Sequence, residues 1–185
     1  VVDYISAVLE RGGAWIDAVM FAHAYRAAIA GDDALVDEIS ELAAAFRASS
    51  ETALESRQQG AAFLTVTRRA WPHAKLDDYA ARQQEQPTAH AVVVALSCAA
   101  HGVPLQPALH AYLHSVAANL VSAGVRLVPL GQTDGQITTA RLGPVVEAVT
   151  ARALRTSLDN LGSAAPALEL CSLRHETQYT RLFRS

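Results

Sequence analysis

The stretch from His90 to Pro104 has the sequence HAVVVALSCAAHGVP and lies in the most apolar part of the chain. Its three consecutive valines, 92–94, could form a buried strand. The alanines around them favour a helix, because alanine loses no side-chain freedom in a helix. Gly102 and Pro104 then supply the stop signal that follows many helices. The apolar run is too short to span a bilayer. It therefore predicts a buried helix.

The composition of the whole chain favours the same class. About one residue in five is alanine, 51% of the 185 residues are hydrophobic, and only 6% are aromatic. This length suits one domain of ordinary size, with a core that needs no metal or disulfide. The formal net charge of −3 leaves no general basic field for nucleic acid or an anionic membrane. We expect a single-domain, all-α bundle of roughly seven or more helices, with neither nucleic acid nor membrane as a partner.

Capping and helix-breaking residues divide the chain into further helices. The Gly12-Gly13 pair either kinks the first helix or separates two helices. Asp32-Asp33 and Asp77-Asp78 are expected as helix caps, and Pro144 lies inside a predicted helix. The helices expected besides the apolar stretch are Tyr4–Ala30, Asp33 through Phe46, Ser50 to about Trp71, Asp77 to about Gln84, Pro107–Leu127, Gln136 to about Leu158, and Ala167–Arg174.

Cysteine usage indicates the compartment. Cys98 and Cys171 are the only cysteines, which excludes a disulfide scaffold and a zinc site made of cysteines alone. Such a chain suits a reducing cytosol, so we expect a cytoplasmic protein. The start, VVDYISAVLE, shows no basic signal-peptide region and no initiating Met. We expect that the natural N-terminus has been trimmed or precedes Val1.

Motifs for common enzyme classes are absent from the sequence. No GxxxxGK[ST] phosphate-binding loop is present, and Lys75 is the single lysine. No G-x-S-x-G nucleophile motif is present either. The sequence therefore predicts an interaction protein with no catalytic residues rather than an enzyme.

Two residue pairs could bind a metal at helical spacing. His110 and His114 are four residues apart, as are Cys171 and His175, and thiolate and imidazole groups suit Zn²⁺ or Ni²⁺. Two ligands do not close a site, so the alternatives are two surface histidines and a cysteine beside an unrelated histidine. We expect no tightly bound cofactor. His23, His90 and His101 lie in apolar segments and are expected to be core or edge histidines.

Two polar segments stand out from the apolar helices. Residues 131–135 (GQTDG) are expected to form a loop between helices. The last eleven residues, 175–185, mix arginine with tyrosine and phenylalanine, which are types enriched at interface hot spots. A frayed terminus is the alternative for this tail. We divide the chain into a helical domain, residues 1–165, and a short helix with a partner-binding tail, residues 166–185.

Long motifs in both segments resemble one family. The run from Tyr112 to Gln136, with NLVSAGVRLVPLGQTDGQ over residues 119–136, resembles the central signature of the UreF family of urease accessory proteins. The end, SLRHETQYTRLFRS over 172–185, is similar to the C-terminus of that family. The spacing of further residues also agrees with that of the family. These are Ser49 with RQQG at 57–60, His90, and LGS at 161–163 with Pro166. The family usually begins with a Gly-Gly-aromatic-Ser segment, which is absent before Val1.

The resemblance implies an all-helical protein that is not an enzyme. Members of this family bind UreD, called UreH in some organisms, recruit the GTPase UreG, and dock on the urease apoprotein. The assembly delivers Ni²⁺ to the urease active site, and UreF is thought to regulate the GTPase. Some members form homodimers. The resemblance therefore implies a scaffold or chaperone for nickel insertion. An alternative is a metallochaperone that itself relays Ni²⁺ in transient contact.

The same resemblance favours an interface over a frayed terminus for the tail. The expected partner-binding residues are Arg174, His175, Glu176, Gln178, Tyr179, Arg181, Leu182, Phe183 and Arg184. A second set is expected either to face a partner or to organise the helix junction, with Arg126 and Asp134 pairing in the latter case. This set comprises Arg126, Gly131, Gln132, Thr133, Asp134 and Gly135. Gly131 and Gly135 are expected to permit tight backbone turns.

Overall fold

The computed structural model describes residues 1–84, 88–128 and 130–179. Within these ranges the chain forms nine α-helices and one short 3-10 helix, with no β-strand. This confirms the all-α prediction and the expected number of helices. The helices are α1 (Val2–Arg11), α2 (Gly13–Ala30), α3 (Asp33–Ala45), α4 (Ser50–Ala70), α5 (Ala74–Arg82), α6 (His90–Ala100), α7 (Leu105–Leu127), α8 (Gln132–Ala153), η1 (Leu158–Asn160) and α9 (Pro166–Glu176).

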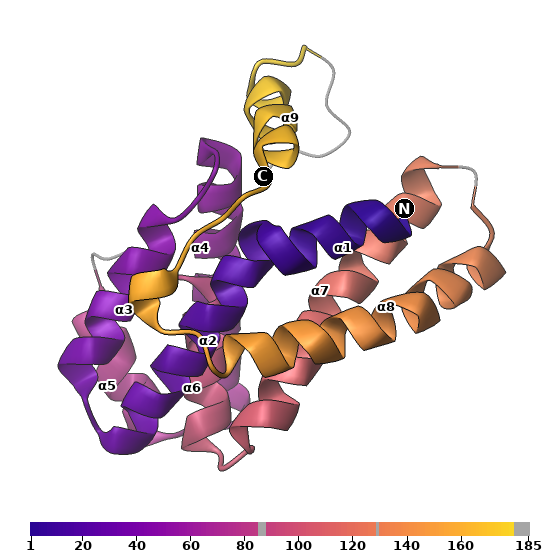
Figure 1. Ribbon diagram of the computed structural model, residues 1–185. Coiled ribbons are helices and arrows are strands. Elements are labelled where there is room, and N and C mark those ends of the chain that lie inside the picture. Colours follow the sequence, from indigo (N-terminus) through magenta and orange to yellow (C-terminus); the bar gives the residue numbers. More distant parts are fainter. Residues whose placement is uncertain (85–87, 129, 180–185) are drawn as a thin grey trace.

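Helices α2 and α6 form the centre of the bundle and pack closely along each other (Figure 1). Most residues of α2 from Ala14 to Ala28 are buried, and the valines at 92 and 93 are fully buried in α6. The apolar stretch is thus a buried helix, as predicted. Helices α3 and α7 pack beside α2, and α4 covers α6. Because α2 and α6 are covered on most sides, most of their residues are apolar.

Helices α7 and α8 form a long antiparallel pair, and α1 lies against both (Figure 1). Gly135 lies in the first turn of α8, where a β-carbon would lie 3.0 Å from Val125 and 3.6 Å from Val121 of α7. This glycine therefore permits a close approach of two helices rather than the turn that we expected. Pro144 lies inside α8, as predicted.

Most predicted helix boundaries are confirmed. Gly12 separates two helices instead of kinking one. Gly31 ends α2 in the left-handed conformation with φ of 73°, which glycine adopts without a steric penalty. The Asp32 carboxylate accepts a hydrogen bond from the Leu35 amide, so it caps α3. Ser49 caps α4 in a reciprocal arrangement with Thr52.

The cap expected at Asp77-Asp78 is wrong. Helix α5 begins earlier, at Ala74, and the His73 imidazole Nδ1 accepts a hydrogen bond from the Lys75 amide. Asp77 instead pairs with Arg68 of α4 at 2.6 Å. The bend at Trp71 and Pro72 places His73 directly before the helix, where its ring can replace an aspartate as the capping group.

The loop expected over residues 131–135 is also wrong, because α8 begins at Gln132. The Asp134 carboxylate accepts a hydrogen bond from the Gly131 amide at 3.0 Å and so satisfies a donor at the start of the helix. An acidic side chain in a first turn is also stabilised by the helix dipole. These polar residues therefore start a helix. The helix ends at Ala153, five residues before the expected end at Leu158.

The C-terminal helix α9 lies apart from the central bundle (Figure 1). It begins at Pro166, one residue before the expected start at Ala167, and extends two residues beyond the expected end at Arg174. None of its residues is buried, whereas a single apolar cluster joins α1 through α8. The division into 1–165 and 166–185 stays a prediction. No helix within the described ranges is long and apolar enough to cross a membrane.

Candidate functional site

The predicted partner-binding residues lie at the end of α9 and directly after it. Arg174, His175 and Glu176 occupy the last turn of α9. Gln178 and Tyr179 follow the helix, and Tyr179 is fully exposed at 100%. The remaining four expected residues fall outside the part of the chain that the structure describes, namely Arg181, Leu182, Phe183 and Arg184.

Polar contacts join α9 to the N-terminal end of α4. The Glu176 carboxylate accepts hydrogen bonds from the Ser50 amide at 2.6 Å and from the Ser50 hydroxyl at 2.8 Å. The His175 Nδ1 atom lies 2.6 Å from a Glu51 carboxylate oxygen. The unpaired amides of a helix N-terminus attract a carboxylate, so Glu176 is well placed there. Helix α9 is therefore held at its C-terminal end by hydrogen bonds to Ser50 and by the contact between His175 and Glu51.

One further hydrogen bond fixes the middle of α9. The Ser172 hydroxyl lies 2.7 Å from the hydroxyl of Ser49, the residue that caps α4. The Leu170 and Leu173 side chains remain 49% and 47% exposed. A helix of 11 residues is marginal in water without packing. Helix α9 therefore presents apolar surface while it rests mainly on polar contacts.

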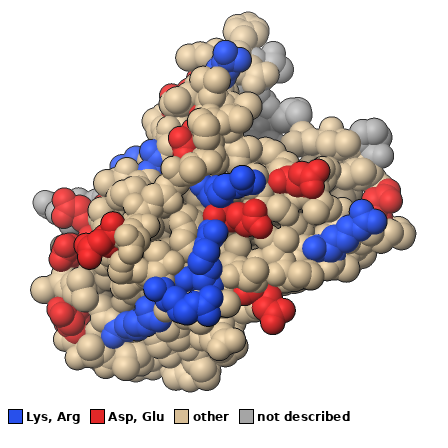
Figure 2. Space-filling model, in the orientation of Figure 1, with Lys and Arg blue, Asp and Glu red and all other residues tan. Residues whose placement is uncertain are grey.

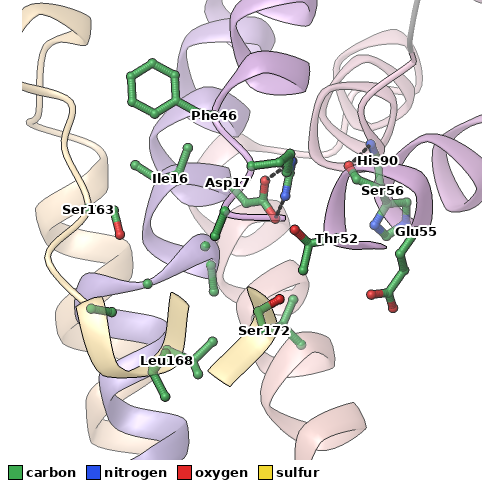
Figure 3. A pocket seen from close by; sticks show the side chains of 18 of the residues that line it. Ile16, Asp17, Phe46, Thr52, Glu55, Ser56, His90, Ser163, Leu168 and Ser172 are labelled. Atoms are coloured by element: carbon green, nitrogen blue, oxygen red, sulfur yellow. Dashed lines mark hydrogen bonds and ion pairs between the residues drawn. The ribbon is translucent and has the colours of Figure 1, made fainter. Parts of the chain in front are cut away.

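A pocket of about 600 Å³ lies between α9 and the bundle (Figure 3). Leu168 and Ser172 of α9 line it on one side, and Thr52 of α4 and Asp17 of α2 line it on the other. Phe46, which follows α3, contributes apolar surface and is 40% exposed. The pocket is thus built from elements that are distant in sequence, and α9 contributes one of its walls.

A buried ion pair lies in the wall of this pocket. The Arg47 guanidinium contacts the Asp17 carboxylate at 2.6 Å, and the two side chains are 10% and 15% exposed. Burial opposes the charge on Arg47, but Asp17 outweighs it through its charge and hydrogen bonds, so the pKa of Arg47 is raised. The Tyr112 hydroxyl of α7 also donates to Asp17, at 3.2 Å. Burial and the neighbouring Asp17 charge raise the Tyr112 pKa well above its ordinary value, which keeps this hydroxyl a donor.

His90 completes the polar side of the pocket. Its ring packs edge-on against Phe63, with 5.7 Å between centroids, and lies at a tilt to Tyr112 at 5.8 Å. Burial lowers the pKa of His90, and Arg47 lowers it further, although Asp17 acts in the opposite direction. The imidazole is therefore neutral at pH 7. This agrees with the expected core or edge histidine.

The second set of predicted residues lies at the far end of the α7–α8 pair. Arg126 lies exposed in the last turn of α7. Gln132, Thr133 and Asp134 are exposed in the first turn of α8. Arg126 and Asp134 are both described residues, and no ion pair joins them. Asp134 instead accepts the hydrogen bond from Gly131. None of these residues lines the pocket.

The metal candidates do not form a multidentate site. His110 and His114 are exposed on α7, Cys171 is exposed on α9, and His175 contacts Glu51. Among the described residues, no group of three or more His, Cys, Asp or Glu side chains could hold a metal ion.

Sequence reasoning missed the Asp17, Arg47 and Tyr112 cluster. One signal was present, because Asp17 is the single carboxylate within the apolar run AWIDAVMFA. A lone carboxylate in a buried helix requires a partner. The identity of that partner depends on Arg47, thirty residues away, and on packing that the sequence does not display.

Comparisons with known proteins extend over nearly the whole chain. A family model described as UreF matches residues 1–143. The urease accessory protein UreF of Granulibacter bethesdensis is 50% identical over 183 residues, which cover 99% of this chain and 77% of that protein. The protein of the same description from Rhodopseudomonas palustris BisB5 is 51% identical over 183 residues, covering 99% and 75%. That of Bradyrhizobium sp. BTAi1 is 50% identical over 182 residues, covering 98% and 75%.

Proposed function

The chain belongs to the UreF family of urease accessory proteins, and from this premise we propose that it serves urease maturation as a non-catalytic scaffold. In this proposal it binds UreD (UreH) and recruits the GTPase UreG to the urease apoprotein in the cytoplasm. The assembled complex inserts Ni²⁺ into the urease active site. Nickel is then the cargo of the assembly rather than a resident cofactor of this chain.

The observation that carries the proposal is the exposed surface of the C-terminal segment. Leu170, Leu173 and Tyr179 are each about half exposed or more, although apolar side chains of this size are usually buried. An aromatic ring with a polar hydroxyl is a common anchor in protein interfaces. We therefore assign UreD binding to this segment, with Tyr179 as an anchor.

Co-purification tests the assignment. The tagged chain is co-expressed with its cognate UreD and UreG, either complete or without residues 175–185, and as a Tyr179→Ala variant. Removal of 175–185 is expected to abolish capture of at least one partner. The single substitution is expected to weaken binding roughly tenfold, which is typical of losing an aromatic anchor.

Trp71→Ala supplies the matched control, because Trp71 is 63% exposed at the opposite end of α4 from the contacts with α9. It should leave partner capture unchanged. Equal capture by the complete and shortened chains, with equal urease activation, would contradict the assignment of the C-terminal segment. Failure of the complete chain to capture either partner would contradict the scaffold proposal itself.

The alternative function, direct relay of Ni²⁺ by this chain, has weaker support. Its candidate ligands form only the pairs Cys171 with His175 and His110 with His114, and His175 is engaged with Glu51. Calorimetry with NiSO₄ distinguishes the two functions. Stoichiometric binding that is lost in Cys171→Ala or His114→Ala would favour the relay.

A further inference from the structure

A band of positive side chains crosses the face shown in Figure 2, over α1, α2 and the C-terminal end of α8. Contacts that join these elements identify Arg26 and Arg152 as two of its members, and Arg11 and Arg155 are the exposed arginines close to these contacts in sequence. We use the name arginine band for Arg11, Arg26, Arg152 and Arg155. The band gathers four positive charges in a chain whose formal net charge is −3.

Backbone carbonyls hold two members of the band in place. Arg152 donates to the carbonyl oxygen of Glu10, and its guanidinium carbon lies 3.7 Å from the centroid of the Trp15 ring. Arg26 donates to the carbonyl oxygen of Leu154 at 2.6 Å. A carbonyl carries no net charge, so these contacts order the guanidinium groups without neutralising them. Groups that are ordered in advance lose less entropy when a partner binds.

The other two members are exposed and lie beside the ordered ones. Arg155 follows Arg152 by three residues, and Arg11 directly follows Glu10. The Glu10 carboxylate, 4.0 Å from the Arg11 guanidinium, is the one acidic group paired with the band in the described ranges. Arg26 and Arg152 have a structural role, because they donate to carbonyl groups at the C-terminal ends of α8 and α1. These contacts do not explain why two further arginines, Arg11 and Arg155, lie next to them.

We propose that the arginine band is a docking surface for an acidic protein surface. Guanidinium groups match carboxylates with two parallel hydrogen bonds, and arginine is the cation best suited to interfaces. Arg152 lies over Trp15, and Arg26 is eleven residues further along α2. The distance along the helix between these two positions is about 16 Å at 1.5 Å per residue. That length suits a row of carboxylates along one helix or strand of a partner. The proposal rests on the proposed function, because it names the chemistry of a second contact within the maturation assembly.

The arginine band also differs from the C-terminal segment in the chemistry that it offers to a partner. Helix α9 offers exposed leucines, whereas the band offers fixed charges. A scaffold that holds more than one partner needs distinct surfaces, and fixed charges favour fast, salt-sensitive association. The band and α9 therefore have separable effects on binding.

Zero-length cross-linking tests the proposal directly. Carbodiimide couples an amine to a carboxylate in contact with it, and Lys75 is the only native lysine of this chain. The Arg11→Lys and Arg155→Lys chains each place an amine in the band, and Arg141→Lys places one on an exposed site of α8 outside the band. The chains are assembled with UreD, UreG and urease apoprotein, and mass spectrometry identifies the linked peptides. We expect the two band variants, but not the control, to link to aspartate or glutamate of one partner.

Binding kinetics supply the second readout. Arg11→Gln/Arg155→Gln removes two charges from the band, and Arg57→Gln/Arg141→Gln removes two exposed charges elsewhere. The association rate of the band variant is expected to fall roughly tenfold at low salt, with the difference shrinking at high salt. The control should remain close to the unaltered chain.

Equal rates for the two double variants, or no cross-link to an acidic residue, would overturn the proposal while leaving the scaffold function intact. Association of the unaltered chain with none of the three components would overturn both. A 20-nucleotide single-stranded DNA that binds the unaltered chain, but not the band variant, would overturn it in favour of a nucleic-acid surface.

Discussion

Gly60 positions two helices because it has no side chain. A β-carbon at this position in α4 would overlap the carbonyl oxygen of Thr88, and it would lie 3.0 Å from the His90 amide nitrogen. The backbone of α4 therefore touches the start of α6. The His90 backbone amide also donates to the Ser56 hydroxyl of α4 at 3.4 Å, and both residues line the pocket.

We predict that Gly60→Ala destabilises the protein by about 1–3 kcal/mol, the cost of forcing atoms into a packed interior. Gly13→Ala, at the start of α2, is the control, because its β-carbon would meet no atom within 4 Å outside its chain neighbours. That change should be neutral, or stabilise by up to about 1 kcal/mol through the greater helix propensity of alanine. Urea unfolding of both variants gives the comparison. Equal stability of the two variants would contradict the close contact.

His90 links the pocket to pH. Its pKa in the folded chain is lowered by burial, while in the unfolded chain it titrates near 6.5. Between these two values the unfolded chain binds more protons, so stability falls as the pH falls below about 6.5. We predict that His90→Phe, which keeps an aromatic ring between Phe63 and Tyr112, flattens this loss. The urea midpoints of both chains at pH 7.5, 6.5 and 5.5 measure this change of stability with pH. An equal change in the variant and the unaltered chain would count against a buried neutral imidazole.

At the scale of elements, α9 is held by few and mainly polar contacts. We predict that Glu176→Gln weakens its docking by about 1 kcal/mol, because a charge-assisted hydrogen bond to the start of α4 is lost. Hydrogen exchange should then be about fivefold faster over residues 166–176 and unchanged in α2. The control is Glu41→Gln, at an exposed position on α3. Equal exchange over 166–176 in both variants would show that Glu176 does not hold the helix.

The success of helix prediction also differs between elements. Gly31 and Asp32 act locally, so the end of α2 and the start of α3 followed from their sequence. The start of α8 could not be predicted in this way, because residues 131–135 include two glycines and polar residues that are typical of loops. The capping contact of Asp134 and the close packing of Gly135 on α7 favour the helix instead. The first contact is local and the second is tertiary, so a capping signal that the prediction missed and the packing on α7 together favour the helix.

At the scale of the whole molecule, the Asp17–Arg47 pair ties α2 to the segment after α3, and Tyr112 adds α7. We predict that Asp17→Asn costs about 3 kcal/mol, because it leaves Arg47 charged and poorly compensated in a mostly buried site. Adding Arg47→Met should recover much of that loss. Thermal unfolding of the single and double variants tests this. A double variant less stable than Asp17→Asn would show that Arg47 contributes through other contacts.

The bundle should also fold without its C-terminal part. Helix α9 buries none of its own residues, whereas α1 to α8 share one apolar cluster. We predict that a chain of residues 1–165 unfolds cooperatively with a midpoint within about 5 °C of the complete chain, since about 1 kcal/mol shifts the midpoint of a domain of this size by 2–4 °C. Calorimetry measures both. Loss of the cooperative transition would contradict the division at residue 165.

The all-α class, the buried helix at 90–100 and most helix ends could be predicted from the sequence, because composition, periodicity and capping act over a few residues. Its two long motifs also indicated the UreF family, which the comparisons confirm. Which distant residues meet follows from the packing alone: Asp17 with Arg47, Glu176 with Ser50, and Arg26 with the Leu154 carbonyl. Such contacts depend on how helices pack, and packing is a property of the whole chain that no local pattern contains.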